Sequence, residues 1–215
     1  MAPGSANPRL RLVRRVVGEP AGGTRPGALT ELDDVQLVAL ARDGDVRAFE
    51  ALYRRHAAFA MNLAVRIQGS ISDVEDVVHD AFLRAQLRLG ELRETSAFKS
   101  WLGSIVVRLV RSRLRRRRLL SAVGFTSPEP VDLDAIASPE ADPEVRALLA
   151  QVYALLRTMN PDDRIAWTLR HVERHRLEEV ADLAGCSLAT AKRRITRAQR
   201  FLADHFVAPF AEEPA

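Results

Sequence analysis

The stretch LEEVADLAGCSLATAKRRITRAQRFL, residues 177–202, decides the fold of the C-terminal part of the chain. Its first segment has the apolar spacing of a short helix and stops at Gly185, a residue that suits the end of a helix. Ser187 follows the turn and can cap a second helix through its hydroxyl. The sequence therefore predicts helices over about 177–184 and 188–204, joined as in a helix-turn-helix.

The second of these helices has two different faces. Ala191, Ile195, Ala198 and Leu202 form an apolar stripe that should pack on the first helix, whereas residues 187–200 include five basic residues and no acidic one. A solvated arginine-rich surface is the alternative interpretation, but the turn, the cap and the charge asymmetry occur together here, which favours DNA binding in the major groove. The residues predicted to contact DNA are Ser187, Thr190, Lys192, Arg193, Arg194 and Arg197.

Composition agrees with a helical protein of the reducing cytoplasm. The 215 residues are 47% hydrophobic but only 6% aromatic, and they contain no apolar run near the roughly 18 residues that span a bilayer. The single cysteine, Cys186, excludes an internal disulfide. The net charge of +4 is too small to identify a partner, so the positions of the charged residues are more informative than their sum.

The helical periodicity divides the chain into two parts, and the predicted fold is all-α, with two small helical domains joined by a flexible linker. Helices are expected over about 33–41, 45–69, 72–89 and 96–118, the third opening with a capping box at Ser72–Glu75. A second set begins at Asp142-Pro143 and Asn160-Pro161. The expected boundaries are a disordered basic leader at 1–29, a helical domain at 30–118, an acidic linker at 119–142, a helix-turn-helix domain at 143–206 and a tail at 207–215.

A second basic surface lies at the end of the helix expected over 96–118. Its last eleven residues, RLVRSRLRRRR, include seven arginines and no acid, which exceeds what helix capping requires and indicates phosphate binding. Phe98 and Trp101 face the apolar side of the same helix, where core packing is the better interpretation than base stacking. The candidate DNA contacts here are Arg108, Arg111, Arg113 and Arg115.

The helix expected over 72–89 presents leucines among acids on its outer side. The residues opposite its buried stripe are Asp76, His79, Asp80, Leu83 and Leu87. Such a face is typical of a docking site for a protein partner. The alternative is that the leader or the other domain covers the two leucines.

These segments together resemble extracytoplasmic-function sigma factors of RNA polymerase. DVRAFEALYRRH (45–56), DVVHDAF (76–82) and FKSWL (98–102) are similar to the second conserved region of that family. NPDDR (160–164), LEEVA (177–181) and SLATAKRR (187–194) are similar to the fourth region. His79 stands where the family often has glutamine, Met159-Asn160-Pro161 replaces the usual Leu-Pro start, and Ala191 stands where valine is common.

The resemblance implies a promoter-specificity subunit. The helix over 72–89 would dock on the β′ clamp helices of core RNA polymerase, and the C-terminal domain would contact the β flap. The loop after Gly90 and the basic helix would open and hold the −10 element of promoter DNA, and the helix-turn-helix would read the −35 element. Members of the family are usually held inactive by an anti-sigma factor or by another signal input.

A stand-alone regulator and an enzyme are the two alternatives to a promoter-specificity subunit. A stand-alone helix-turn-helix regulator would bind a palindromic site without polymerase, and it does not account for the second basic cluster at 108–118. An enzyme is not expected, because the sequence has no glycine-rich phosphate loop, paired catalytic carboxylates or metal-ligand cluster, and His171 and His175 lack the glutamate spacing of a zinc protease. No cofactor, metal site or membrane association is expected.

Overall fold

The computed structural model describes residues 28–124, 131–137 and 140–206, and these residues form helices without any strand. The all-α prediction is confirmed. The leader up to residue 27, the tail from residue 207, and residues 125–130 and 138–139 of the expected linker lie outside the described residues. Within the described residues, no helix is long and apolar enough to cross a membrane.

The helices fall into two halves of the chain. The first half contains α2 (Ala28–Glu31), α3 (Asp34–Arg42), α4 (Val46–Gln68), α5 (Val74–Leu87) and α6 (Phe98–Ala122). The second half contains α7 (Leu133–Ile136), α8 (Pro143–Thr158), α9 (Pro161–His171), α10 (Leu177–Ala184) and α11 (Leu188–His205).

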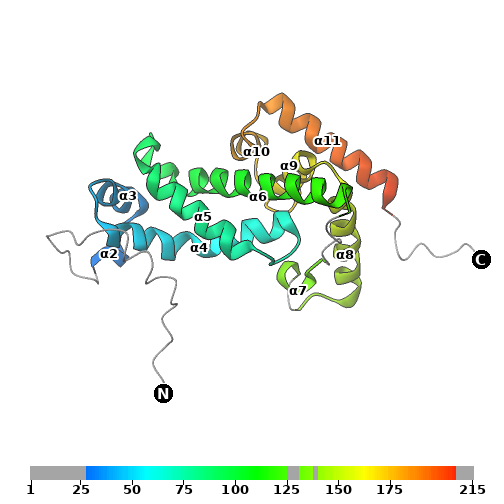
Figure 1. The fold of residues 1–215 in the computed structure, drawn as a ribbon, viewed down its shortest axis with the longest axis horizontal. Helices are drawn as coiled ribbons and strands as arrows, with labels where there is room; N and C mark the ends of the chain where they lie inside the picture. Colours follow the sequence, from blue (N-terminus) through cyan, green and yellow to red (C-terminus); the bar gives the residue numbers. More distant parts are fainter. Residues whose placement is uncertain (1–27, 125–130, 138–139, 207–215) are drawn as a thin grey trace, which may run out of the picture.

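Helices α3 to α6 enclose the first core, and α4 and α6 run alongside each other through it (Figure 1). Phe98, Leu52 and Leu102 are completely buried there, as their helical spacing predicts. Trp101 is only partly buried and packs against this core. Two short 3₁₀ turns, Leu89–Glu91 and Thr95–Ala97, connect α5 to α6.

The ends of α4 agree with the sequence prediction. Asp45 accepts hydrogen bonds from the backbone N–H groups of Arg47 and Ala48, at 2.9 and 3.4 Å. Gly69 ends the helix in the left-handed region, with φ 67°, and its N–H donates to the Val65 carbonyl. A side chain on Gly69 would also meet the ring of Tyr153, since an added Cβ would lie 2.8 Å from its Cδ1.

The start of α5 differs from the prediction. The helix begins at Val74, and its N-cap is Asp73, which has φ 56° and makes no capping bond with its side chain. The expected capping box at Ser72 is therefore wrong. Two other side chains hold this turn instead. The nearby Gln68 donates from Nε2 to the Ser72 carbonyl at 3.1 Å, and the distant Arg113 donates to the Asp73 carbonyl at 2.8 Å.

The segment expected to be a linker contains helical structure. α6 continues to Ala122, beyond the expected end at Arg118, and α7 occupies Leu133–Ile136. The backbone N–H of Asp132 donates to the Gly69 carbonyl at 3.1 Å, so this part of the segment lies against the end of α4.

The two halves lie directly against each other. α9 and α10 pack on α6, and α9 also packs on α4 (Figure 1). Tyr153, Leu156 and Met159 form a second buried cluster with Ala198 of α11. The helix-turn-helix therefore rests with one side on the first half of the chain.

Candidate nucleic-acid interface

The turn between α10 and α11 has the geometry that a helix-turn-helix requires. Gly185 has φ 58°, which glycine adopts without strain, and its N–H donates to the Asp182 carbonyl at 3.1 Å. Cys186 N–H donates to the Ala181 carbonyl at 2.9 Å. The Ser187 hydroxyl accepts from the Thr190 N–H at 3.3 Å, which confirms the predicted cap.

The predicted reading face of α11 lies mainly on the surface. Ala191, Ile195 and Ala198 are buried on the other side, as the apolar stripe predicts. Arg193 leans back along the helix, and its guanidinium donates to the Thr190 hydroxyl at 3.3 Å. Of the predicted contacts, Ser187, Lys192, Arg193 and Arg197 are exposed, whereas Thr190 and Arg194 are half-buried.

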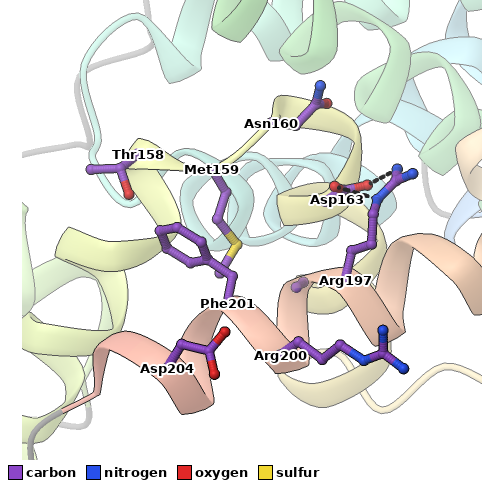
Figure 2. A pocket seen from close by; sticks show the side chains of 9 residues that line it. Thr158, Met159, Asn160, Asp163, Arg197, Arg200, Phe201 and Asp204 are labelled. Carbon is purple, nitrogen blue, oxygen red and sulfur yellow. Dashed lines mark hydrogen bonds and ion pairs between the residues drawn. The ribbon is translucent and has the colours of Figure 1, made fainter.

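Two arginines of this face contact acids at the start of α9. Arg197 donates to both carboxylate oxygens of Asp163, at 3.0 Å from Nε and 2.6 Å from Nη2 (Figure 2). Arg194 lies 3.3 Å from the Asp162 carboxylate. Asp163 is buried, so its ion pair with Arg197 is partly shielded from water. The Arg197 side chain nevertheless exposes 62% of its surface.

Sequence reasoning missed these two acids as part of the site. Asp162 and Asp163 follow Asn160 and Pro161, and acids in this position are typical of the first turn of a helix. Asn160 does cap α9, since its side chain accepts from the Asp162 N–H at 2.9 Å. No local pattern shows that α11 returns over this turn, because the pairs join residues more than 30 positions apart.

The four predicted arginines of α6 have different surroundings. Arg108 is exposed, and Arg115 exposes 59% of its side chain although it reaches Asp162 at 2.8 Å. Arg111 is half-buried: its Nε lies 2.9 Å from Asp162, and its Nη2 donates to the Ala184 carbonyl at 2.5 Å. Burial lowers the pKa of Arg111, and the nearby Asp162 carboxylate partly offsets this. Arg113 holds the Asp73 carbonyl, so Arg108 and Arg115 are the two most accessible of the set.

The predicted docking face of α5 is open to solvent. Leu87 exposes 85% of its surface and Leu83 exposes 41%. Asp76 and His79 are exposed beside them, and Asp80 is half-buried with Arg113 4.0 Å away. Among the described elements, α5 packs mainly on α4, α6 and the Leu89–Glu91 turn, all in the first half of the chain.

The loop between α5 and α6 is fixed from α3 by a residue that sequence reasoning also missed. Arg42 donates from Nε to the Leu89 carbonyl at 3.2 Å and from Nη2 to the Leu92 carbonyl. The loop backbone around Gly90 is thus held by one side chain from about 50 positions earlier. A basic residue near the end of a helix usually indicates only a favourable dipole interaction, so no local pattern distinguishes Arg42 from other arginines.

A hollow of about 400 Å³ lies between α8, α9 and α11. In Figure 2, the Phe201 ring lies beside Met159, while Arg200 and Asp204 stand at the lower rim. Its walls carry both acidic and basic groups, so it does not have the uniform charge of an anion site. Among the described residues, no group of three or more His, Cys, Asp or Glu side chains is arranged to hold a metal ion.

Comparison with known proteins identifies the family. The model of "Sigma-70 region 2" matches residues 52–119 and that of "Sigma-70, region 4" matches residues 149–202, together more than half of the chain. The RNA polymerase sigma-H factor of Pseudomonas aeruginosa is 30% identical over 192 residues, which cover 86% of this chain and 99% of that protein. The ECF RNA polymerase sigma-E factor of Escherichia coli is 32% identical over 186 residues, covering 83% and 96%.

Solved structures with this fold include CnrH, determined in complex with the cytosolic domain of CnrY. It is 27% identical, with a TM-score of 0.53, over 80% of this chain and 95% of that one. The sigma factor RpoE of Bartonella quintana, determined with the anti-sigma factor NepR, has a TM-score of 0.57 at 22% identity, over 74% and 96%. The chain therefore belongs to the extracytoplasmic-function sigma factors, the promoter-specificity subunits of RNA polymerase, with region 2 and region 4 both present.

Proposed function

We propose that α11 is the −35 reader of this sigma factor. The single observation that supports this most is the capped helix-turn-helix whose outer side presents Lys192, Arg193 and Arg197 to solvent. A helix of this kind enters the major groove with its first turns near base edges, and arginine can bind guanine through two hydrogen bonds. Ser187 and Thr190 lie at the N-terminal end of the helix and would contact the backbone phosphates of DNA bound there.

The −10 element is the proposed ligand of the α6 basic surface and the loop before it. Arg108 and Arg115 extend from α6 and would bind phosphates, and Arg111 and Arg113 would join them if their present contacts were released. The loop around Gly90 has its backbone fixed by Arg42, which favours a defined contact with an unpaired base over a loose one.

Core polymerase is the proposed partner of the α5 face. Leu83 and Leu87 offer apolar area to a helical partner such as the β′ clamp helices, and Asp76, His79 and Asp80 surround them with polar contacts. Region 4 would contact the β flap. The complexes of CnrH with CnrY and of RpoE with NepR support an anti-sigma factor as a further partner.

The remaining assignments follow from these roles. Residues 30–118 and 143–206 would act as separate DNA-binding modules, with residues 119–142 allowing them to part. The protein would have no catalytic activity or cofactor of its own and would work in the cytoplasm, where the polymerase and the chromosome are. The similarity to sigma factors over both regions does not favour the alternative of a stand-alone regulator.

Transcription in vitro tests the proposal. Purified core polymerase with this chain, on a library of promoter fragments, should give start sites that are absent with core alone. Arg193→Ala should weaken those transcripts, whereas Arg200→Ala, on the flank of the same helix, serves as a matched control for charge. Transcripts that do not depend on the chain, together with tight binding of a palindromic duplex without polymerase, would instead support the stand-alone regulator.

A further inference from the structure

Arg93 is an exposed arginine in the loop between α5 and α6, and it has no hydrogen-bond or ion-pair partner among the described residues. The other charged residues of this loop are paired within it. Arg88 donates to the Glu91 carboxylate from Nε at 2.9 Å and from Nη2 at 2.6 Å, and Glu94 accepts from the Ser96 hydroxyl at 2.9 Å. Within the described loop, the guanidinium of Arg93 is therefore left to bind another molecule.

The backbone on the N-terminal side of Arg93 is held from another helix. Arg42 of α3 donates to the carbonyls of Leu89 and Leu92, and the second carbonyl belongs to the residue directly before Arg93. The side chains of both leucines are buried, so they fix the loop from inside as well. In Figure 1, α3 lies at the end of the molecule where α5 ends and α6 begins. The peptide before Arg93 thus depends on a contact between residues 50 positions apart.

The backbone on the C-terminal side of Arg93 is fixed by local contacts. The Glu94 carboxylate accepts from the Ser96 N–H at 3.5 Å in addition to the hydroxyl. The 3₁₀ turn Thr95–Ala97 follows, packs on α3 and leads directly into α6. Ordering a backbone costs conformational entropy, and a loop that is already ordered loses less of it when a ligand binds. Arg93 is therefore a free donor on a backbone that is prepared on both sides.

A fixed backbone suits contact with a base better than contact with a phosphate. Phosphates repeat along a strand, so an arginine on a mobile backbone can bind them from many positions. A base must be met at one distance and angle, which requires that the donor is held in place before binding. The guanidinium group is planar, presents several N–H donors to a base edge, and can stack on the face of an unpaired base.

We propose that Arg93 contacts an unpaired base of the −10 element, and that Arg42, which lies outside the loop, is the residue that positions it. The proposal rests on the proposed binding of the −10 element to this loop. It makes Arg93 a specificity-determining residue and gives Arg42 an effect on base preference without contact with the DNA. Base preference then depends on α3 as well as on the loop.

Binding of single-stranded oligonucleotides to the reconstituted holoenzyme tests the proposal. The oligonucleotides carry the −10 sequence of a promoter found by the transcription assay, with each of the four bases in turn at each position, and fluorescence anisotropy measures their affinities. The unchanged protein should prefer one base at the position that Arg93 contacts. Arg93→Gln should reduce the ratio of the best to the worst affinity there about tenfold, the effect of losing one base contact. Preferences at the other positions should stay the same.

Substitutions of Arg42 test the positioning role. Arg42→Gln should lower the same ratio at the same position, and combining it with Arg93→Gln should cause no further loss, because Arg42 acts through Arg93. Arg42→Lys keeps a charged donor without the planar fork of the guanidinium, so it should restore part of the preference. Arg54→Gln is the matched control and should change nothing, since Arg54 is exposed on α4 and its ion pair is with Glu50, at 2.7 Å.

Several outcomes would overturn the proposal. An equal loss of affinity for all four bases with Arg93→Gln, together with a weaker salt dependence, would make Arg93 a phosphate contact. Additive effects of the two substitutions, or weaker binding of a −35 duplex by the Arg42→Gln holoenzyme, would give Arg42 a general structural role; thermal melts of each variant check the fold. If the unchanged protein discriminates between bases but neither variant alters the preference, this assignment alone fails. If the unchanged protein discriminates at no position, the proposed binding of the −10 element fails as well.

Discussion

Replacement of Tyr153 by phenylalanine isolates one contact between the two halves. The ring is 1% exposed, and its hydroxyl donates to the Arg66 carbonyl at 3.1 Å. Arg66 is in the last turn of α4, where carbonyl groups have no partner within the helix, so Tyr153 supplies one. Burial raises the pKa of Tyr153 to about 12, which keeps the hydroxyl protonated as a donor at any ordinary pH.

The expected loss is worked from this single hydrogen bond. Phenylalanine keeps the ring and its packing, so the free energy of unfolding should fall by about 1 kcal/mol, and by up to about 3 kcal/mol if the Arg66 carbonyl stays dry. For a chain of this size, 1 kcal/mol corresponds to roughly 2–4 °C in the melting temperature.

Urea unfolding followed by circular dichroism would measure the change. Tyr53→Phe is the matched control, because the Tyr53 hydroxyl has no hydrogen bond within the described part of the chain. The Tyr53 ring packs on Phe82, with 4.5 Å between the ring centroids. If Tyr153→Phe and Tyr53→Phe have the same midpoint as the unchanged protein, the hydroxyl does not join the halves in solution and the reasoning is wrong.

Four further changes test other parts of the molecule. Ser187→Ala should lower the free energy of unfolding by about 1 kcal/mol, measured with urea, because the Thr190 N–H loses its cap. Leu83→Asp should weaken retention of core polymerase in a pull-down while leaving the thermal melt unchanged, since the side chain is exposed. Arg193→Ala, assayed with the reconstituted holoenzyme, should cost about 1–3 kcal/mol of promoter binding if its guanidinium binds a base through two hydrogen bonds. The free energy of unfolding should also fall as the pH drops below 6.5. Burial lowers the pKa of His56 although Asp34 lies 2.7 Å away, so on acidification the unfolded chain binds the proton before the folded chain does. Urea midpoints at pH 7.5 and 5.5 would measure this change.

Each of these has an outcome that would contradict it. An unaltered midpoint for Ser187→Ala would mean that the cap contributes nothing, and normal polymerase retention by Leu83→Asp would remove α5 from the docking surface. Equal affinity and equal base preference for Arg193→Ala would exclude that residue from recognition. A His56→Gln variant with the same acid sensitivity as the unchanged protein would place the titrating group elsewhere.

Helix positions and several helix ends could be predicted from the sequence because their causes are local. Gly69 and Gly185 adopt positive φ where glycine follows an apolar stripe, and Ser187 caps the helix that begins after it. The buried side of α11 follows from its spacing alone. These features depend on residues within four positions of one another, which is the distance over which periodicity and capping rules operate.

The features that could not be predicted depend on contacts between distant parts of the chain. A capping box at Ser72 is expected from local residues, but Arg113, from 40 positions later, donates to the Asp73 carbonyl and holds that turn in another conformation. The pairs of Asp162 with Arg115 and of Asp163 with Arg197 join α9 to two other helices. A charged residue has the same local pattern whether water or a distant arginine surrounds it, so only the folded arrangement separates the two cases.

The way Arg42 holds the loop between α5 and α6 affects how that loop can change. Both of its hydrogen bonds go to backbone carbonyls, at Leu89 and Leu92, and every amino acid has such a group. Substitutions of the intervening residues Gly90 and Glu91 therefore keep both acceptors, whereas an insertion or deletion would move one of them out of reach. If the loop contacts the −10 element as proposed, new base preferences can arise here through side-chain replacement at constant loop length, without a new backbone conformation having to evolve.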